Sequence, residues 1–212
     1  MTFDSFIHKV DEIKVLNPKG VIAHEMMIPK SRSQYLQADE FLDKNPRYSA
    51  VTMLLYPKDG ITNLLLIERA IYKGVHSGQI AFPGGKYEDE DVNLENTALR
   101  EMEEEVGVSA KSVEIVKPYT KIYIPPSNFI VQPYLVIATD NLNFMPSPYE
   151  VAKLIEMPLK ILFSEDIVEI VSLKTSYAEV TDVPAFSFNN HIIWGATAMM
   201  LSELKETLKE IF

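Results

Sequence analysis

Four glutamates crowd into little more than one helical turn in the first half of the chain. They are Glu101, Glu103, Glu104 and Glu105, in the run EMEEE. Like charges three or four residues apart on a helix repel by ~0.2–0.5 kcal/mol a pair, and acids in the last turn oppose the helix dipole by ~0.3–1 kcal/mol each. A purely structural helix gains nothing from this arrangement. The crowding therefore indicates a functional site at which a bound cation offsets the repulsion.

The glutamates belong to a predicted amphipathic helix over residues 94–106. Asn93 is suited to cap its start, and Gly107 is suited to the left-handed conformation that ends a helix. The apolar stripe that predicts the buried face consists of Ala98, Leu99, Met102 and Val106. The carboxylates that share an arc of about 100° beside this stripe are Glu101, Glu104 and Glu105. Glu103 falls on the opposite side.

The segment before this helix argues against a merely solvated acidic face, which is the usual interpretation of an isolated acidic run. It contains the turn Phe82-Pro83-Gly84-Gly85, where paired glycines permit close approach of the backbone to a ligand. The turn lies in a long predicted loop over residues 69–91. Loops of that length in compact domains are usually functional. Turn, loop and helix together predict a ligand site.

This constellation resembles the Nudix hydrolase box. The pattern is a glycine, five residues, a glutamate, seven residues, and then Arg-Glu-hydrophobic-x-Glu-Glu-x-Gly-hydrophobic. Its second half matches at every fixed position: Arg100, Glu101, Met102, Glu104, Glu105, Gly107 and Val108. In the first half, Asp91 stands where the pattern has glutamate, six residues after Gly85, and eight residues instead of seven separate it from Arg100. The same one-residue lengthening, with aspartate, is associated with the coenzyme A pyrophosphatase branch of the family.

A second stretch resembles a signature of the same branch. It reads LLIERAIYKGVHSGQIAFPGG, with Ile67 where the branch has threonine and Gly74 where it has a second arginine. The fragments RYSAVTMLL, which starts at Arg47, and WGATA, which starts at Trp194, also look like this branch. The resemblance covers roughly residues 46 to 200.

The pattern of the whole chain predicts one compact domain, because 212 residues with 47% hydrophobic composition can bury a sizeable core. Apolar residues at helical spacing predict an N-terminal helix over residues 3–13, followed by an irregular segment. Strands are predicted over residues 47–56, 61–68, 112–124 and 129–138, a hairpin at Asn189-Asn190, and a closing helix over residues 198–211. The resemblance implies an α/β/α sandwich with a mixed β-sheet. We expect an N-terminal extension over residues 1–46 and a Nudix hydrolase domain over residues 47–212.

Charge and composition restrict the partners. A net charge of −10 disfavours nucleic acid and anionic membranes, whose binding needs a basic surface. No stretch approaches ~18 consecutive apolar residues, and the first residues lack the apolar core of a signal peptide. We therefore expect a soluble cytoplasmic protein with a small-molecule partner, and a homodimer stays open. With no cysteine and four scattered histidines, hard oxygen ligands remain for a metal.

The predicted carboxylates suit a metal–diphosphate complex, because Mg²⁺ is usually held by one or two carboxylates plus substrate phosphates. We expect Mg²⁺ or Mn²⁺ on Glu101, Glu104 and Glu105, where it would polarise the P–O bond and activate water. The resemblance gives Arg100 the role of orienting Glu104. The residues expected beside the substrate are Arg69, Phe82, Gly84 and Gly85. The alternative for Arg69 is a surface ion pair with a neighbour such as Glu68.

The general base stays open between the helix and a distant loop, with Glu101, Glu104 and Glu150 as candidates. Glu150 follows the run Pro146-Ser147-Pro148-Tyr149 and matches a glutamate of the branch pattern; its alternative is a structural cap. Trp194 is expected in the core rather than as a platform for substrate, since it stands between an apolar strand and an apolar helix. His76 is a weaker candidate for a phosphate contact.

The resemblance implies metal-dependent hydrolysis of a diphosphate bond in a nucleoside diphosphate derivative. Coenzyme A or an acyl derivative is the expected substrate, giving 3′,5′-ADP and a phosphopantetheine. Because Gly74 replaces the branch arginine, ADP-ribose or a dinucleotide is the alternative. A non-catalytic Nudix-like ligand-binding module is a further alternative, since fold does not fix function. The intact carboxylate set argues against it, because a silent module has no need of mutually repelling acids.

Overall fold

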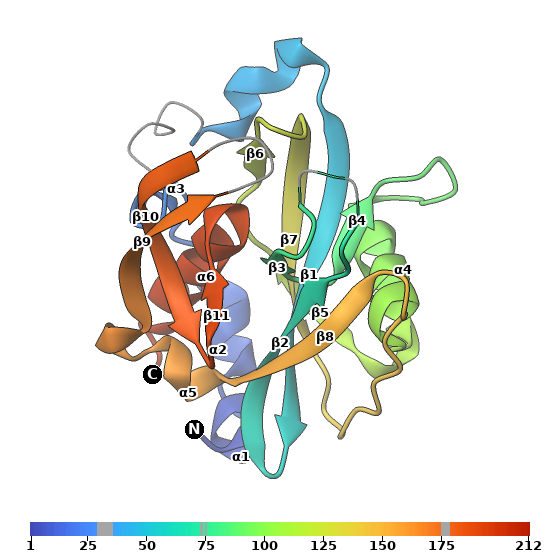
Figure 1. The fold of residues 1–212 in the computed structure, drawn as a ribbon. Coiled ribbons are helices and arrows are strands. Elements are labelled where there is room, and N and C mark those ends of the chain that lie inside the picture. Colours follow the sequence, from blue (N-terminus) through green and yellow to red (C-terminus); the bar gives the residue numbers. More distant parts are fainter. Residues whose placement is uncertain (29–35, 73, 75, 175–178) are drawn as a thin grey trace.

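The computed structural model describes residues 1–28, 36–72, 74, 76–174 and 179–212. In these residues an eight-stranded mixed sheet lies between α4 (Leu94–Val106) and α6 (Gly195–Leu208) (Figure 1). Its strands are β1 (Arg47–Lys58), β2 (Ile61–Arg69), β3 (Ile80–Ala81), β4 (Gly84–Lys86), β5 (Glu114–Pro118), β6 (Ile122–Ile124), β7 (Phe129–Ile137) and β8 (Val151–Pro158). The central pair, β1 and β7, is parallel, and the other pairs are antiparallel.

A smaller sheet of three strands precedes α6 in the chain (Figure 1). It consists of β9 (Val168–Lys174), β10 (Glu179–Phe188) and β11 (His191–Ile193). The remaining short elements are α1 (Phe3–Ile7), α2 (Val10–Val15), α3 (Val21–Glu25), α5 (Leu159–Leu162) and the 3₁₀ helices η2 (Ala38–Lys44), η3 (Ala110–Ser112) and η4 (Glu165–Ile167). No helix in the described segments is both long and apolar enough to cross a membrane.

The two sides of the large sheet form two separate cores, because successive strand residues point to opposite faces. On β1, Leu54 packs in one cluster with Met102 of α4. Its neighbour Leu55 packs in the other cluster with Leu201 of α6. The same alternation holds along β2 and β7. The α/β/α sandwich with a mixed sheet is thereby confirmed.

The pairing of β1 positions the glycine turn. β1 pairs with β2 over its last four residues, but with β4 near its start, where Val51 lies opposite Gly84. The backbone of Thr52 also donates to the carbonyl of Pro83 (2.8 Å). Gly84 has a φ of 154°, and a Cβ there would overlap the carbonyl of Ala50. Only glycine therefore lets the turn lie this close to β1.

The predicted N-terminal helix is wrong in extent, since α1 and α2 are separate short helices. The amide of Lys9 donates to the carbonyl of Phe6 (2.9 Å), a tight turn that interrupts the helix. The apolar spacing was nevertheless informative, because Phe6 and Ile13 are fully buried in the core on the α6 side. The division of the chain at residue 46 stays a prediction.

The predicted strand over residues 112–124 is also wrong, because it is broken into β5 and β6. Thr120 lies in the break, where its amide and hydroxyl both donate to Glu203 of α6 rather than to a neighbouring strand. The predicted loop over residues 69–91 contains two short strands, β3 and β4. The hairpin at Asn189 and Asn190 is confirmed, with positive φ at both residues between β10 and β11.

Candidate active site

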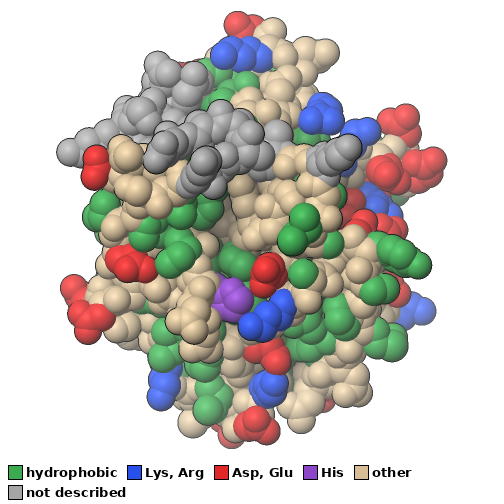
Figure 2. Space-filling view, viewed as in Figure 1, with side chains coloured by type: hydrophobic (Ala, Val, Ile, Leu, Met, Phe, Trp, Pro, Cys, Tyr) green, Lys and Arg blue, Asp and Glu red, His purple; other side chains and the backbone are tan. Residues whose placement is uncertain are grey.

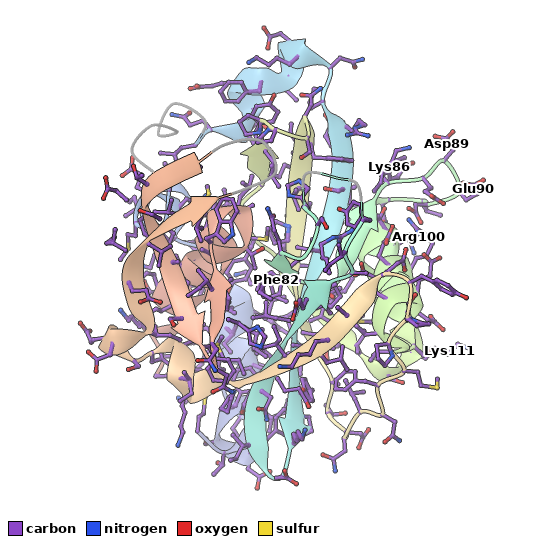
Figure 3. All side chains as sticks on the ribbon, in the orientation of Figure 1. Phe82, Lys86, Asp89, Glu90, Arg100 and Lys111 are labelled. Carbon is purple, nitrogen blue, oxygen red and sulfur yellow. The ribbon has the colours of Figure 1, made fainter. Side chains whose placement is uncertain are left out.

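A pocket of about 400 Å³ lies between α4, β4 and the start of α6. Its polar wall includes Glu101, Glu105 and Glu150, together with Gly84 and Gly85. Other acidic side chains lie outside the pocket, and a group of them covers the loop that leads into α4 (Figure 2). Asp89 and Glu90 of that loop project away from the body of the molecule, whereas Phe82 lies at its centre (Figure 3).

Glu105 is the most deeply buried carboxylate of the α4 acidic run, with 2% of its surface exposed. One carboxylate oxygen accepts a hydrogen bond from the amide of Gly84 (2.8 Å), and the other lies 3.5 Å from the guanidinium of Arg69. Burial raises the pKa of Glu105 to about 7 despite these two contacts, and the nearby charges of Glu101 and Glu150 raise it further. Such an acid favours a proton or a bound cation over an unpaired negative charge.

Glu101 lies beside Glu105 at the same wall. Its carboxylate rests against Gly85 so closely that a Cβ at position 85 would overlap it. Burial raises the pKa of Glu101, although the charge of Arg100, 3.1 Å away, opposes the shift. Gly84 is thus required by its close approach to β1, whereas a side chain at position 85 would displace the Glu101 carboxylate.

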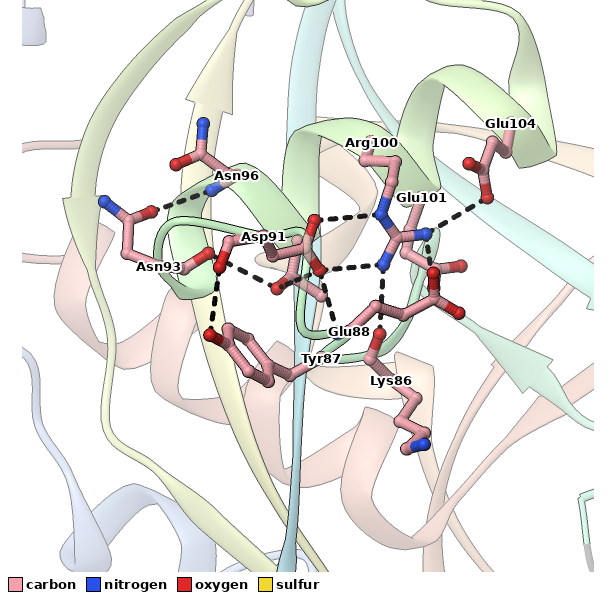
Figure 4. Close-up of polar contacts among 10 residues, drawn as sticks. Lys86, Tyr87, Glu88, Asp91, Asn93, Asn96, Arg100, Glu101 and Glu104 are labelled. Carbon is pink, nitrogen blue, oxygen red and sulfur yellow. Dashed lines mark hydrogen bonds and ion pairs between the residues drawn. The ribbon is translucent and has the colours of Figure 1, made fainter.

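Arg100 is held by Asp91 in a two-pronged ion pair (Figure 4). Its Nε and Nη2 each donate to one oxygen of Asp91, and both distances are 2.9 Å. Asp91 also accepts from the hydroxyl of Thr97 (2.9 Å) and the amide of Glu88 (3.1 Å). The hydrogen bond from Arg100 lowers the pKa of Asp91 to about 2, although burial opposes the shift. Asp91, which stands where the family pattern has glutamate, therefore holds Arg100 in place.

The structural role of Asp91 was not predicted. The sequence marks this residue only as a departure from the box, although its nine-residue separation from Arg100 across a helix start is compatible with contact. Arg100 also donates to the carbonyl of Lys86 (3.0 Å), which ties α4 to the end of β4. One arginine thereby joins the loop, the strand and the helix that carry the site.

Glu104 is placed apart from the other predicted metal ligands. Its side chain is 55% exposed and accepts from Nη1 of Arg100 (3.1 Å), as expected from their four-residue spacing. It does not line the pocket. Within the described residues, no three His, Asp or Glu side chains form a ready-made metal-binding group. The structure thus brings Glu101 and Glu105 together at the pocket and leaves Glu104 on Arg100.

Glu150 reaches the pocket because its loop is attached to two elements of the site. The amide of Ser147 donates to the carbonyl of Glu105 (2.9 Å), and the carbonyl of Glu150 accepts from the amide of Ala70 (2.8 Å). The Glu150 carboxylate itself is exposed at the pocket and has no hydrogen-bond partner among the described residues. The alternative role of a side-chain cap is therefore not supported.

The predicted substrate-binding residues line the same pocket. Arg69 makes its ion pair with Glu105 rather than with Glu68, and its guanidinium lies 5.9 Å from the ring centre of Tyr72. Phe82 is 1% exposed and forms part of the wall. His76 also lines the pocket and lies 3.1 Å from the side-chain oxygen of Gln79; burial lowers its pKa.

The core placement of Trp194 is wrong. Trp194 is only partly buried and lines the pocket, where it stands immediately before the first residue of α6. The apolar strand and helix that flank it in the sequence do enter the core, but the chain turns between them and leaves the indole at the surface of the cavity. Sequence reasoning missed this because apolar neighbours do not reveal the direction of a side chain at a helix start.

The pocket fits a divalent cation. Glu105 is an acid whose pKa is raised by burial, and Glu101 and Glu150 add negative charge beside it. Carboxylate oxygens are the ligands that Mg²⁺ prefers. Glu101 and Glu105 are the pocket residues that would hold the ion.

Comparison with known proteins defines the class to which this site belongs. The sandwich presents helix carboxylates and a glycine turn to one pocket, and the family model described as NUDIX domain matches residues 46–170. The chain therefore belongs to the Nudix family and is a Nudix hydrolase. Hydrolases of this family generally use divalent metal cations.

Relatives and solved structures agree. A protein of Photorhabdus laumondii named uncharacterized Nudix hydrolase NudL is 30% identical over 175 residues, which cover 79% of this chain and 88% of that protein. A protein of Yersinia pestis with the same name is 35% identical over 144 residues, 68% of this chain and 71% of that protein. The Nudix hydrolase RenU of M. smegmatis has a similar fold, with a TM-score of 0.53 at 17% identity over 79% of this chain and 88% of that chain.

Proposed function

We propose that this Nudix hydrolase cleaves the diphosphate bond of a nucleoside diphosphate derivative, with coenzyme A or acyl-coenzyme A as the first candidate substrate. The observation that carries the proposal is the convergence of Glu101, Glu105 and Glu150 with the Gly84–Gly85 turn on a pocket of about 400 Å³. Ligand pockets of this volume suit small molecules. The net charge of −10 supports a small anionic substrate held through a metal over a nucleic-acid polymer.

The site would hold Mg²⁺ or Mn²⁺ on Glu101 and Glu105. Glu104 can join them by leaving Arg100, because an exposed ion pair of this kind contributes only ~0–1 kcal/mol. When bound, such an ion neutralises the diphosphate and lowers the pKa of the attacking water. Arg69 would exchange its contact with Glu105 for a substrate phosphate, since its guanidinium already lines the pocket.

The general base is proposed to be Glu150. A base must take a proton from water at the pocket, and the Glu150 carboxylate is exposed there without a hydrogen-bond partner among the described residues. Glu101 is the alternative, although its carboxylate is already engaged by Arg100. Glu104 is the weakest of the three candidates, since it does not line the pocket.

The choice of base is tested by Glu150→Gln. Loss of a general base costs about 10²–10⁴ in kcat, and metal affinity measured by calorimetry should stay close to that of the unmodified protein. The matched control is Glu103→Gln, an exposed acid on the far side of α4. A fall in kcat of less than about tenfold for Glu150→Gln would return the role to the helix.

The choice of substrate is tested at Gly74, where the coenzyme A pyrophosphatase branch has an arginine. A charge-assisted contact to phosphate contributes about 1.5–3 kcal/mol, so we expect coenzyme A to be hydrolysed with a high KM. Any Cβ at position 74 would overlap the ring of Tyr72, which is exposed enough to move. Lys73, a candidate substitute for the missing arginine, lies outside the described residues.

The experiment compares the unmodified protein, Gly74→Ala and Gly74→Arg against coenzyme A, ADP-ribose and a dinucleotide with Mg²⁺ or Mn²⁺. Gly74→Ala separates the displacement of Tyr72 from the effect of the new charge. We expect Gly74→Arg alone to improve kcat/KM for coenzyme A more than for ADP-ribose. A preference for ADP-ribose of about tenfold or more, ~1.4 kcal/mol, that Gly74→Arg leaves unchanged would replace coenzyme A with the alternative. No cleavage of any diphosphate would favour the ligand-binding module.

A further inference from the structure

The pocket is lined by aromatic side chains as well as by acids, and Trp194 is one of them. Trp194 is the only tryptophan in the chain. It lines the pocket, is partly exposed, and is absent from the buried core of the described residues. A large apolar side chain left facing a cavity loses the stabilisation that burial would give it. Contact with a bound ligand would explain this position.

The backbone around Trp194 is held in place. The following residue, Gly195, has a φ of 61°, in the left-handed region that favours glycine. The hydroxyl of Thr197 donates to the carbonyl of Ile80 on β3 (3.0 Å), so the helix start is tied to the strand that precedes the glycine turn. Ala198 and Leu201 are fully buried and fix the rest of α6. Trp194 thus stands on a rigid support.

The other aromatic residues of the pocket are already occupied. Phe82 is buried within the wall. The guanidinium of Arg47 lies 4.1 Å from the ring centre of Phe129, and that of Arg69 lies 5.9 Å from the ring centre of Tyr72. Among the described residues, no ring or cation is stacked on Trp194. Its indole is the aromatic surface that remains for a ligand.

We infer that Trp194 is the stacking platform for the nucleobase of the substrate and a determinant of its affinity. This inference rests on the proposed function for the class of substrate. The acids of α4 would hold the diphosphate through a bound cation beside the glycine turn, which leaves the base to the part of the pocket at the start of α6. Any nucleobase can stack on an aromatic side chain, because every base has a π face.

A nucleobase fits this part of the pocket better than the pantetheine arm of coenzyme A does. A base is flat and rigid, so it can cover the indole without losing internal freedom. The pantetheine arm is a flexible saturated chain, and its ordering on one aromatic face would cost several rotatable bonds. The platform therefore predicts that affinity follows the base of the substrate.

The first test uses the fluorescence of Trp194, which reports on this position alone because the chain has no other tryptophan. AMP is titrated into the unmodified protein in the presence of Mg²⁺, with ribose 5-phosphate as the matched probe that lacks the base. We expect saturable quenching by AMP and none by ribose 5-phosphate. Unchanged emission with AMP, or equal changes with both probes, would overturn the inference.

The second test separates the platform from catalysis. Trp194→Ala should raise KM for the hydrolysed diphosphate by about tenfold to a hundredfold, whereas Trp194→Phe should recover most of this loss and kcat should change little. Circular dichroism and the melting temperature check that both variants fold. Equal KM values in all three proteins would refute the stacking role. Absence of hydrolysis in the unmodified protein would instead refute the proposed function, because the AMP titration does not depend on turnover.

Discussion

At the scale of single residues, the site depends on one buried acid. Glu105 is enclosed by its own helix, the glycine turn and Arg69, and burial raises its pKa to about 7. Because this value exceeds the ordinary pKa of glutamate, the folded protein binds a proton there more tightly than the unfolded chain does. Glu105 therefore contributes stability that is complete at acidic pH and is lost as the pH rises through about 7.

Glu105→Gln should remove this pH-dependent loss, since glutamine keeps an oxygen acceptor for the amide of Gly84. In a chelator at pH ~8, we expect the variant to be more stable than the unmodified protein by about 1–3 kcal/mol. That difference corresponds to several degrees in melting temperature and should vanish near pH ~4. Mg²⁺ should raise the melting temperature of the unmodified protein but not of the variant, and most turnover should be lost.

The control for this measurement is Glu103→Gln, which removes an exposed charge from the same helix without touching the pocket. Melting curves with and without Mg²⁺ across pH ~4 to 8 supply the comparison. Ordinary activity in Glu105→Gln, or full activity of the unmodified protein in excess chelator, would exclude the metal role of Glu105.

At the scale of one element, α4 is positioned from both ends. Asn93 accepts a hydrogen bond from the amide of Asn96 (2.9 Å) at its start, and Gly107 ends it with a φ of 74°. The last carbonyls of the helix accept from the loop that carries Glu150. Between the ends, Arg100 is held by Asp91 and donates to the carbonyl of Lys86, which ties the helix to the end of β4.

Asp91→Asn should weaken this attachment, because it leaves Arg100 without its two-pronged partner. We expect a loss of about 1–3 kcal/mol in the free energy of unfolding at neutral pH, measured by denaturant titration. The pKa of Asp91 is lowered, so its contribution is present above the ordinary aspartate range and is lost as the pH falls through about 2. The difference between variant and unmodified protein should therefore shrink in acid.

Glu104→Gln is the matched control, since it removes the exposed partner of the same arginine and should cost less than about 1 kcal/mol. A cost for Asp91→Asn no larger than that of this control would mean that Asp91 does not position the helix.

At the scale of the whole molecule, Glu203 joins three distant parts of the chain. It is fully buried on α6 and accepts from the amide of Gly20 (2.8 Å), the imidazole of His24 (3.1 Å), and the amide and hydroxyl of Thr120 (3.2 and 2.5 Å). Burial raises the pKa of Glu203, but the hydrogen bonds from His24 and Thr120 outweigh it and hold the pKa below its ordinary value. The network ties the N-terminal segment and the β5–β6 connection to α6, the helix that follows Trp194.

Glu203→Gln should destabilise the protein by about 2–4 kcal/mol at neutral pH, because one amide cannot accept all these bonds. The lowered pKa means that the ionised Glu203 stabilises the fold above the ordinary glutamate range, and that this contribution is lost in acid. Thermal unfolding across pH measures the effect. Glu206→Gln, which removes an ion pair with Lys209 on the same helix, is the control. Similar melting temperatures for the two variants would contradict the role of Glu203.

Each feature that was predicted correctly depends on residues that lie close together in the sequence. The caps and apolar stripe of α4, the hairpin at Asn189 and Asn190, and the strands β1, β2 and β7 all follow from local spacing. The separation of α1 from α2 and the break between β5 and β6 did not. In the second case the deciding partner of Thr120, Glu203, is 83 residues away.

The sequence by itself determined the family and the acidic helix, because motif spacing and periodicity are local properties, and the family resemblance implied the sandwich. Only the tertiary structure decided how the acids are used. Glu101 and Glu105 line the pocket, whereas Glu104 forms an ion pair with Arg100. Asp91 holds the same arginine. The direction of Trp194 was decided in the same way. These outcomes depend on burial and on partners from separate elements, and an arc on a helix does not specify either.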